Sequence, residues 1–264
     1  MGTSSAPLIA ALFDIHGNLP ALEAVLANAS AAGAARLVVG GDIVDGPLPR
    51  QTLDRLLALR PRPLFLRGNT ERALVQGYIA PGEPEPGRPT PLQQWVAGQL
   101  TAGQLRFLAE LPRCIHLETS ALRLLFCHAT PNSDREVFTT ATPSSRLRSI
   151  FEDVDADVVV CGHTHIQFET AVDSLRIFNA GSVGMPTGEP AAQWALISES
   201  IRLMRTPYDL ASAREEIAAS GYPGAAVFIE ENLDRPHELA AAVAYFEARA
   251  SKDPRQGAEP PGWG

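Results

Sequence analysis

Short apolar runs that alternate with helical patterns, most of them ending in polar residues, constrain this chain's fold more than any other feature. The runs are three to six residues long and mostly continuous. Continuous apolarity is typical of strands that are covered on both faces, and strands that alternate with helices predict an α/β fold. The predicted strands are Leu8–Phe13, Leu37–Val39, Pro63–Leu66, Leu122–Cys127, Val158–Cys161 and Arg176–Phe178.

Helical patterns lie between and after these strands. In Leu19–Ala29 the apolar residues recur at i, i+3, i+4 and i+7, as on one face of a helix. Thr101 and Gln104 have the form of a capping box, so a helix should begin there and stop before Pro112. Further helices are predicted over Pro49–Leu59, around Leu147, Ile150 and Phe151, and, as one exposed helix, over Asp234–Ala250.

The charge and composition of the chain argue against two classes of binding partner, nucleic acids and membranes. The chain has 22 basic and 30 acidic residues, a net charge of −8, which argues against general binding to nucleic acids or membrane surfaces. No apolar run reaches the roughly 18 residues of a membrane span, and the first residues lack the basic region of a signal peptide. Three cysteines in a chain of this length do not suggest a disulfide framework. We therefore expect a cytoplasmic protein without a membrane partner.

Residues of the types that bind metals follow five of the predicted strands. Open α/β sheets place their sites at the carboxyl ends of strands, so these side chains should meet at one edge. Four of the six histidines lie there, whereas His116 and His237 do not and are assigned no role. The pooled candidates are Asp14, His16, Asp42, Asn69, His128, His163 and His165. Two carboxylates, one carboxamide and four imidazoles suit two divalent ions that share a bridging carboxylate.

Taken in order, five motifs resemble those of the calcineurin-like metallophosphoesterases. They are D-x-H at 14–16, G-D-x-x-D-G at 41–46, G-N-x-E at 68–71, a histidine at 128 and G-H-T-H at 162–165. N-A-G-S-V-G at 179–184 is similar to the family's small bacterial phosphodiesterase branch. The resemblance covers residues 8–209 and implies a four-layer α/β/β/α sandwich of two mixed sheets flanked by helices.

The resemblance also implies how the seven ligands divide between two metals. Asp14, His16 and His165 would hold the first, Asn69, His128 and His163 the second, and Asp42 would bridge them. Two metals about 3.5–4 Å apart can activate one bridging hydroxide to attack phosphorus, so no protein nucleophile is needed. We expect Mn, with Fe, Zn, Ni and Co as alternatives, and a small-molecule phosphoester as substrate.

Position 70 departs from the family pattern. Relatives with G-N-H-[DE] use that histidine as the acid for the leaving group, whereas this chain has Thr70. A threonine hydroxyl is too weak an acid to replace it, and general acid catalysis contributes about 10²–10⁴-fold. The catalytic candidates are Thr70, because it occupies the position of the missing acid, and Asp42, which would bridge the metals. We expect a phosphodiesterase that favours good leaving groups over an efficient alkyl phosphomonoesterase.

Further residues near the motifs are candidates for contacts with substrate. Arg135 could clamp a phosphate, or it could pair with Asp134 or Glu136. Asn18 could contact substrate or cap the first helix, and Asn69 could contact substrate as well as metal. The residues expected to brace these loops without contacting substrate are Arg67, Glu71 and Asp45, the last through backbone N–H groups.

Two other functions fit the same residues. One is a non-catalytic interaction scaffold, which the missing acid at Thr70 slightly favours. The other is a phosphoprotein or nucleotide phosphatase that uses the same site. Retention of all seven ligands favours an enzyme, because a scaffold has no physical need for four histidines beside two aspartates.

The chain is predicted to divide into a metallophosphoesterase domain over residues 1–222, a C-terminal helical extension over 223–250 and a disordered tail over 251–264. Residues 81–91 hold five prolines in eleven positions. A segment so rich in proline is expected to form a stiff, extended surface loop. The alternative is that it forms a lid over the substrate.

Overall fold

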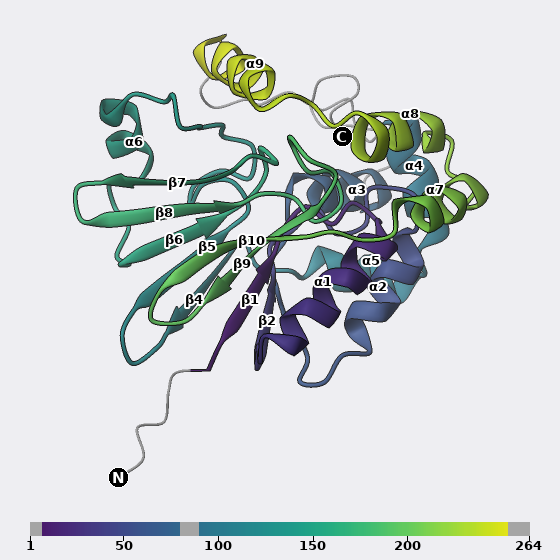
Figure 1. Cartoon of the computed structure of the whole chain (residues 1–264), viewed down its shortest axis with the longest axis horizontal. Coiled ribbons are helices and arrows are strands. Elements are labelled where there is room, and N and C mark those ends of the chain that lie inside the picture. The colour runs from purple at the N-terminus through teal and green to yellow at the C-terminus, as the bar shows by residue number, and fades with distance from the viewer. Residues whose placement is uncertain (1–6, 80–89, 253–264) are drawn as a thin grey trace.

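The computed structural model describes residues 7–79 and 90–252, in which two five-stranded sheets pack face to face (Figure 1). The first sheet runs β10 (Ile201–Thr206), β9 (Ala192–Ile197), β1 (Ile9–Leu12), β2 (Arg36–Val39) and β3 (Leu64–Phe65). The second sheet runs β4 (Cys114–Glu118), β5 (Arg123–Cys127), β6 (Val158–Cys161), β8 (Leu175–Ala180) and β7 (Gln167–Val172).

The six predicted strands are confirmed as β1, β2, β3, β5, β6 and β8, which pair in parallel within each sheet. Sequence analysis missed β4, β7, β9 and β10, which all pair antiparallel. Three of these are edge strands with partly exposed positions, so they lack a continuous apolar run. The fourth, β9, is buried throughout but carries the polar Gln193 within its run.

Helices cover the outer face of each sheet (Figure 1). The helices are α1 (Leu19–Ala31), α2 (Pro49–Leu57), α3 (Asn69–Ile79), α4 (Pro91–Gln99), α5 (Ala102–Ala109), α6 (Ser144–Ile150), α7 (Leu210–Ala219), α8 (Ala225–Ile229), the π-helix η1 (Glu230–Asp234) and α9 (Leu239–Lys252). The predictions of α1, α2, α5 and α6 are confirmed, including the capping box of Thr101 and Gln104. No helix within the described ranges is long and apolar enough to cross a bilayer.

Three apolar cores separate the layers. Ile9, Ala11 and Phe13 face the second sheet, where they pack in one core with residues such as Phe126. The alternate residues of β1, including Leu12, belong instead to the core beneath the first sheet's helices. A third core lies beneath α6 and α9 on the outer face of the second sheet. This order of layers confirms the expected α/β/β/α sandwich.

The C-terminal segment differs from the single exposed helix that was predicted over Asp234–Ala250. Pro236 lacks a backbone N–H and disfavours helical geometry in the residue before it, so a break separates η1 from α9. Moreover, α9 is not exposed throughout, because Ala242 and Phe246 are buried. The helix extends to residue 252, so residues 251 and 252 of the disordered tail predicted over 251–264 are helical. The rest of that tail, residues 253–264, and residues 81–89 of the proline-rich segment lie outside the described residues.

Candidate metal centre

The loops after β1, β2 and β6 hold their polar side chains through a left-handed backbone. Non-glycine residues seldom adopt this conformation, which costs on the order of 1–3 kcal/mol each and is found mainly where surrounding structure imposes it. Five of the seven predicted ligands have positive φ angles: Asp14 (53°), His16 (47°), Asp42 (50°), His163 (69°) and His165 (55°). The turns direct these side chains toward one region between the two sheets.

One cluster contains Asp14, His16 and His165, whose ligand atoms all lie within 4.8 Å of one another. The Nε2 atoms of the two histidines are 3.2 Å apart, and His165 Nε2 is 3.5 Å from Asp14 Oδ1. His16 Nδ1 lies 2.9 Å from the carbonyl of Asp45, so it donates there and leaves Nε2 as an acceptor. Asp45 also braces the loop through Oδ2, which accepts a hydrogen bond from Gln93.

A second cluster contains Asp42, His128 and His163, again with ligand atoms within 4.8 Å of one another. His128 Nε2 lies 3.4 Å from Asp42 Oδ2 and 3.0 Å from Asn69 Oδ1, which brings the seventh predicted ligand beside this cluster. His128 Nδ1 lies 2.9 Å from the carbonyl of Gly40. This contact orients the His128 ring in the same way as the carbonyl of Asp45 orients the His16 ring.

Asp42 lies between the clusters, and its two oxygens have different surroundings. Oδ2 is 3.8 Å from His16 Nε2 and 3.4 Å from His128 Nε2, so it faces both clusters. Oδ1 accepts hydrogen bonds from the backbone N–H of Thr70 at 3.0 Å and from its hydroxyl at 2.9 Å. The hydroxyl of Thr70 therefore holds Asp42 in place.

The ligand atoms of the two clusters suit divalent cations. Among the described residues, Asp14 Oδ1 is buried and accepts no hydrogen bond. His16 Nε2, which is left as an acceptor, lies 3.2 Å from His165 Nε2, so a proton or a cation must lie between the two nitrogens. Imidazole nitrogens and carboxylate oxygens around such a point are ligands that Mn, Fe, Zn and Co accept.

Charges within the centre strongly perturb its titrating groups. Burial would raise the pKa of Asp42, but the charge of His128 and its hydrogen bond hold that pKa well below its usual range. Burial lowers the pKa of His128, yet the charge of Asp42 outweighs it and raises the pKa to about 10. Burial and the charge of His128 lower the pKa of His163 to about 3. The carboxylates thus create a field that favours positive charge here.

Glu71 ties the loop after β2 to the loop after β3. Its Oε2 accepts hydrogen bonds from the backbone N–H groups of Asp42 (2.8 Å) and Gly68 (2.9 Å), and its Oε1 accepts one from Ile43 (2.7 Å). Burial and the charge of Asp42 raise the pKa of Glu71 to about 7. A Cβ at Gly68 would lie 2.0 Å from Asp42 Oδ1, so only glycine permits this approach.

Arg135 lies beside the second cluster. Its Nε is buried without a hydrogen-bond partner among the described residues, and its carbonyl is 3.3 Å from His163 Nε2. The two acidic residues considered as ion-pair partners of Arg135 interact with other residues. Asp134 pairs with Arg72 at 2.6 Å, and Glu136 accepts a hydrogen bond from a threonine hydroxyl. This placement favours a contact with substrate over a surface ion pair.

Asn18 has a structural role instead. Its Oδ1 accepts from Ala21 N at 3.2 Å, which caps α1, and its Nδ2 donates to the carbonyl of Gly184 at 3.0 Å and to Tyr208 Oη at 3.3 Å. Both ends of the amide are therefore occupied within the protein. These contacts favour the helix cap over the contact with substrate that was also considered.

Sequence analysis overlooked the two backbone carbonyls that orient the histidines, those of Gly40 and Asp45. Every residue carries a carbonyl, so no residue type marks these two. Both residues lie between β2 and α2, in the loop that also carries Asp42, and this position is the one signal that could have indicated them.

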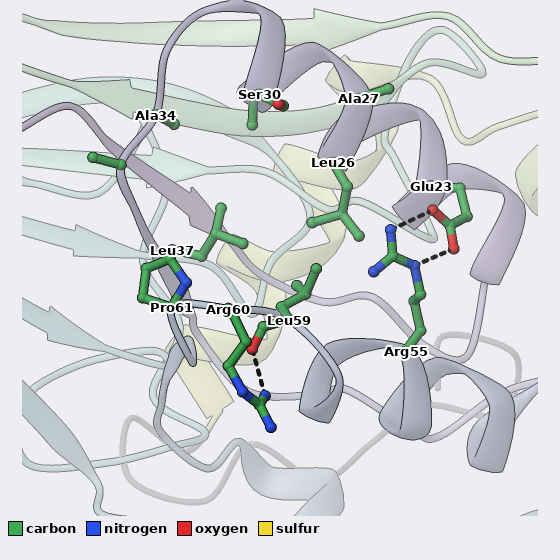
Figure 2. Close-up of a pocket in the computed structure, with 12 residues that line it drawn as sticks. Glu23, Leu26, Ala27, Ser30, Ala34, Leu37, Arg55, Leu59, Arg60 and Pro61 are labelled. Carbon is green, nitrogen blue, oxygen red and sulfur yellow. Dashed lines mark hydrogen bonds and ion pairs between the residues drawn. The ribbon is translucent and has the colours of Figure 1, made fainter.

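A pocket of about 400 Å³ lies apart from this centre, between α1, α2 and the start of β2 (Figure 2). Figure 2 shows the Glu23–Arg55 pair at its rim, and Arg60 turned back onto the carbonyl of Leu59. The metal centre is at the carboxyl end of β2, whereas this pocket is at the opposite end. None of the residues that line the pocket belongs to the centre.

Comparison with known proteins gives a family match over most of the chain. Residues 8–200 match the calcineurin-like phosphoesterase superfamily domain. An uncharacterized protein of Methanocaldococcus jannaschii is 27% identical over 240 residues, which cover 82% of this chain and 94% of the relative.

Two solved structures share the fold. The crystal structure of a metallophosphoesterase from Sphaerobacter thermophilus is 24% identical, with a TM-score of 0.67 over 90% of this chain and 100% of the other. A hypothetical protein from Pyrococcus horikoshii is 18% identical, with a TM-score of 0.72 over 87% of this chain and 99% of the other.

Proposed function

The chain belongs to the calcineurin-like phosphoesterase superfamily, and from that membership we propose that it is a binuclear metal-dependent phosphodiesterase. The observation that supports this most directly is the pair of ligand clusters on either side of Asp42. The unsatisfied oxygen of Asp14 within the first cluster adds to it.

Each cluster would hold one divalent cation, with Mn as the favoured metal. The ligands would be Asp14, His16 and His165 for the first, His128, His163 and Asn69 for the second, and Asp42 for both. When bound, such cations lower the pKa of water and neutralise charge on phosphoryl oxygens. The carbonyls of Gly40 and Asp45 keep the Nε2 atoms of His128 and His16 turned toward the centre.

The chain's own residues would position the substrate rather than attack it. The buried thiols of Cys127 and Cys161 are unsuited as nucleophiles, because burial raises the pKa of each. Arg135 would bind a phosphoryl oxygen, since guanidinium groups pair well with phosphate and its Nε lacks a partner within the described part of the chain. With no histidine at position 70, a diester is a better substrate than an alkyl monoester, whose leaving group needs an acid.

The scaffold alternative explains less of the geometry. Five ligand residues hold left-handed backbones, which costs on the order of several kcal/mol in total. A protein that only presented its surface to a partner would gain nothing from this strain, whereas metal binding would offset it.

Metal content and substrate preference test the proposal. Protein purified without chelator and reconstituted with Mn²⁺ should hold about two ions per chain. It should hydrolyse bis-p-nitrophenyl phosphate faster than an alkyl phosphomonoester. D42N should lose metal and activity, while H116A, an exposed change on β4, should keep both. Fewer than one ion per chain would favour the scaffold, and a clear preference for the alkyl monoester would favour a phosphatase.

A further inference from the structure

The glutamine of the capping box at the start of α4 reaches the loop that carries Asp45. In this box the hydroxyl of Thr90 accepts a hydrogen bond from the backbone N–H of Gln93 (3.2 Å), and Gln93 Oε1 accepts one from the backbone N–H of Thr90 (3.0 Å). Because Oε1 is the acceptor here, the other end of the amide is a donor. Its Nε2 donates to Asp45 Oδ2 at 3.1 Å, in a buried contact between residues 48 positions apart.

Asp45 transmits this contact to the first cluster through its own backbone. Its carbonyl lies 2.9 Å from His16 Nδ1, which leaves His16 Nε2 directed toward the centre. The next residue, Gly46, packs directly against His16, because a Cβ at Gly46 would overlap the carbonyl of His16. A chain of hydrogen bonds therefore leads from Gln93 on α4, through Asp45, to a ligand of the first cluster.

The helix that carries Gln93 is a fixed support. Val96 on α4 is buried in the core beneath the first sheet's helices, and Trp95 packs edge to face on Tyr222 with ring centroids 5.4 Å apart. Gln93 is itself buried, and its two hydrogen bonds leave its amide a single orientation. A side chain held in this way can keep the side chain of Asp45 in one place.

The second cluster is oriented differently. His128 Nδ1 lies 2.9 Å from the carbonyl of Gly40, and the backbone N–H of Gly40 donates to the carbonyl of Leu12 on β1 at 2.7 Å. The sheet itself therefore fixes the carbonyl that orients His128. The contact from α4 acts on the other histidine, so the two clusters should differ in their dependence on α4.

We propose that Gln93 is a positioning residue for the first of the two metal ions; this inference rests on the proposed metal-dependent function. By holding Asp45, it fixes the ring of His16 and sets the affinity of the first cluster, while the second cluster does not depend on it. Groups that hydrogen-bond to metal-ligating histidines typically contribute about 10–100-fold to metal affinity. Gln93 acts one residue further from the ion, so we expect an effect of about tenfold.

Gln104 on α5 provides a matched control. It closes a capping box of the same Thr-x-x-Gln form, in which its Oε1 accepts from the backbone N–H of Thr101 at 2.8 Å. Its Nε2 also donates to a carboxylate, that of Asp54, at 2.8 Å. Asp54 lies on α2 and its side chain is more than half exposed. Q93M and Q104M thus each remove one helix cap and one contact between an amide and a carboxylate, but only Q93M breaks the route to His16.

The test measures Mn²⁺ affinity, by competition with a chelator, in full chains that keep one cluster intact. H128A keeps the ligands of the first cluster, and H16A keeps those of the second. Q93M should weaken Mn²⁺ binding about tenfold in H128A and leave it unchanged in H16A, because effects of residues that share no partner are independent. Q104M should change Mn²⁺ affinity in neither. Q93N and Q104N, whose amides are one methylene shorter, form a second pair with the same expected contrast if a methionine variant does not fold.

Two results would contradict the role of Gln93. Unchanged Mn²⁺ affinity in H128A carrying Q93M would show that the contact with Asp45 does not act on His16. Equal weakening in H128A and H16A would show that Gln93 supports the fold as a whole and not the first cluster. A wild-type chain that bound no Mn²⁺ would instead overturn the proposed function itself, and the role of Gln93 with it.

Discussion

At the scale of single residues, the centre is built from backbone conformations that most side chains avoid. Asp14 and His16 turn directly after β1, and their N–H groups donate to the carbonyls of Gly41 (3.1 Å) and Asp42 (2.9 Å). The two loops therefore hold each other in the left-handed geometry. Strain of this kind persists only where neighbouring contacts impose it, and it supports the proposed role of these residues as ligands.

His163 allows this strain to be measured, because its side chain is only partly buried and its φ is 69°. In metal-free protein, H163G should be more stable than H163A by about 1 kcal/mol, since glycine tolerates positive φ and alanine does not. At the neighbouring Thr164, which does not have a positive φ, alanine should be the more stable of the pair. Thermal or urea unfolding of the four variants checks this, and equal stability of H163A and H163G would show that no strain is stored there.

Thr70 should act on metal affinity through Asp42. Removing its hydroxyl in T70V breaks the 2.9 Å hydrogen bond to Asp42 Oδ1. A hydrogen bond to a charged group contributes about 1.5–3 kcal/mol, so Mn²⁺ affinity should fall by roughly 10-fold or more. T70S keeps the hydroxyl and should restore most of the affinity, as measured by competition with a chelator. Equal affinity in T70V and wild type would mean that the hydroxyl does not position Asp42.

At the scale of elements, α3 links the centre to its surroundings from its first turn. Asn69, Thr70 and Glu71 contact the second cluster or the loop that carries Asp42. The next residue, Arg72, pairs with Asp134 through two hydrogen bonds of 2.6 and 3.0 Å. The helix is therefore joined to the loop that carries Arg135.

The Arg72–Asp134 pair should make stability depend on pH in the acid range. Burial would raise the pKa of Asp134, but Arg72 lowers it below its ordinary value. A lowered folded-state pKa stabilises the protein above the unfolded value of about 3.9, and this stability is lost as the pH falls through the folded-state pKa. D134N should remove that part of the pH dependence, at a cost of roughly 1–3 kcal/mol at neutral pH.

Asp173 provides the control for this prediction. It also pairs with an arginine, Arg148, at 2.9 Å, but both side chains are more than half exposed. Exposed pairs contribute about 0–1 kcal/mol, so D173N should change unfolding little between pH 3 and 7. If D134N and D173N gave the same pH profile, partial burial would not strengthen the Arg72 pair.

At the scale of the whole molecule, the centre exists because the two sheets pack against each other. The first sheet contributes Asp14, His16, Asp42 and Asn69, and the second contributes His128, His163 and His165. Residues such as Phe13 and Phe126 fill the core between them. Metal binding should therefore stabilise the packing of the sheets.

Removing metal should lower the melting temperature of the whole chain. A ligand at 100 times its dissociation constant stabilises the folded state by about 2.7 kcal/mol, which for a chain of this size is a rise of roughly 5–10 °C. Chelator-treated protein should thus have a lower melting temperature, and added Mn²⁺ should return the melting temperature to that of the untreated protein. D42N should show little response to Mn²⁺. A melting temperature of the wild type that does not change with Mn²⁺ would contradict a link between the centre and the fold.

The six parallel strands and the seven polar residues near their ends were predictable from the sequence, because continuous apolar runs and the residues that follow them are local features. The antiparallel strands β4, β7, β9 and β10 were not, because their mixed sequences become strands only through pairing with neighbours.

Tertiary structure alone decided what Thr70 and Asn18 do. Thr70 meets Asp42, 28 positions away, and Asn18 meets Gly184, 166 positions away. Contacts between residues so far apart depend on how the layers assemble, and no local pattern records that assembly.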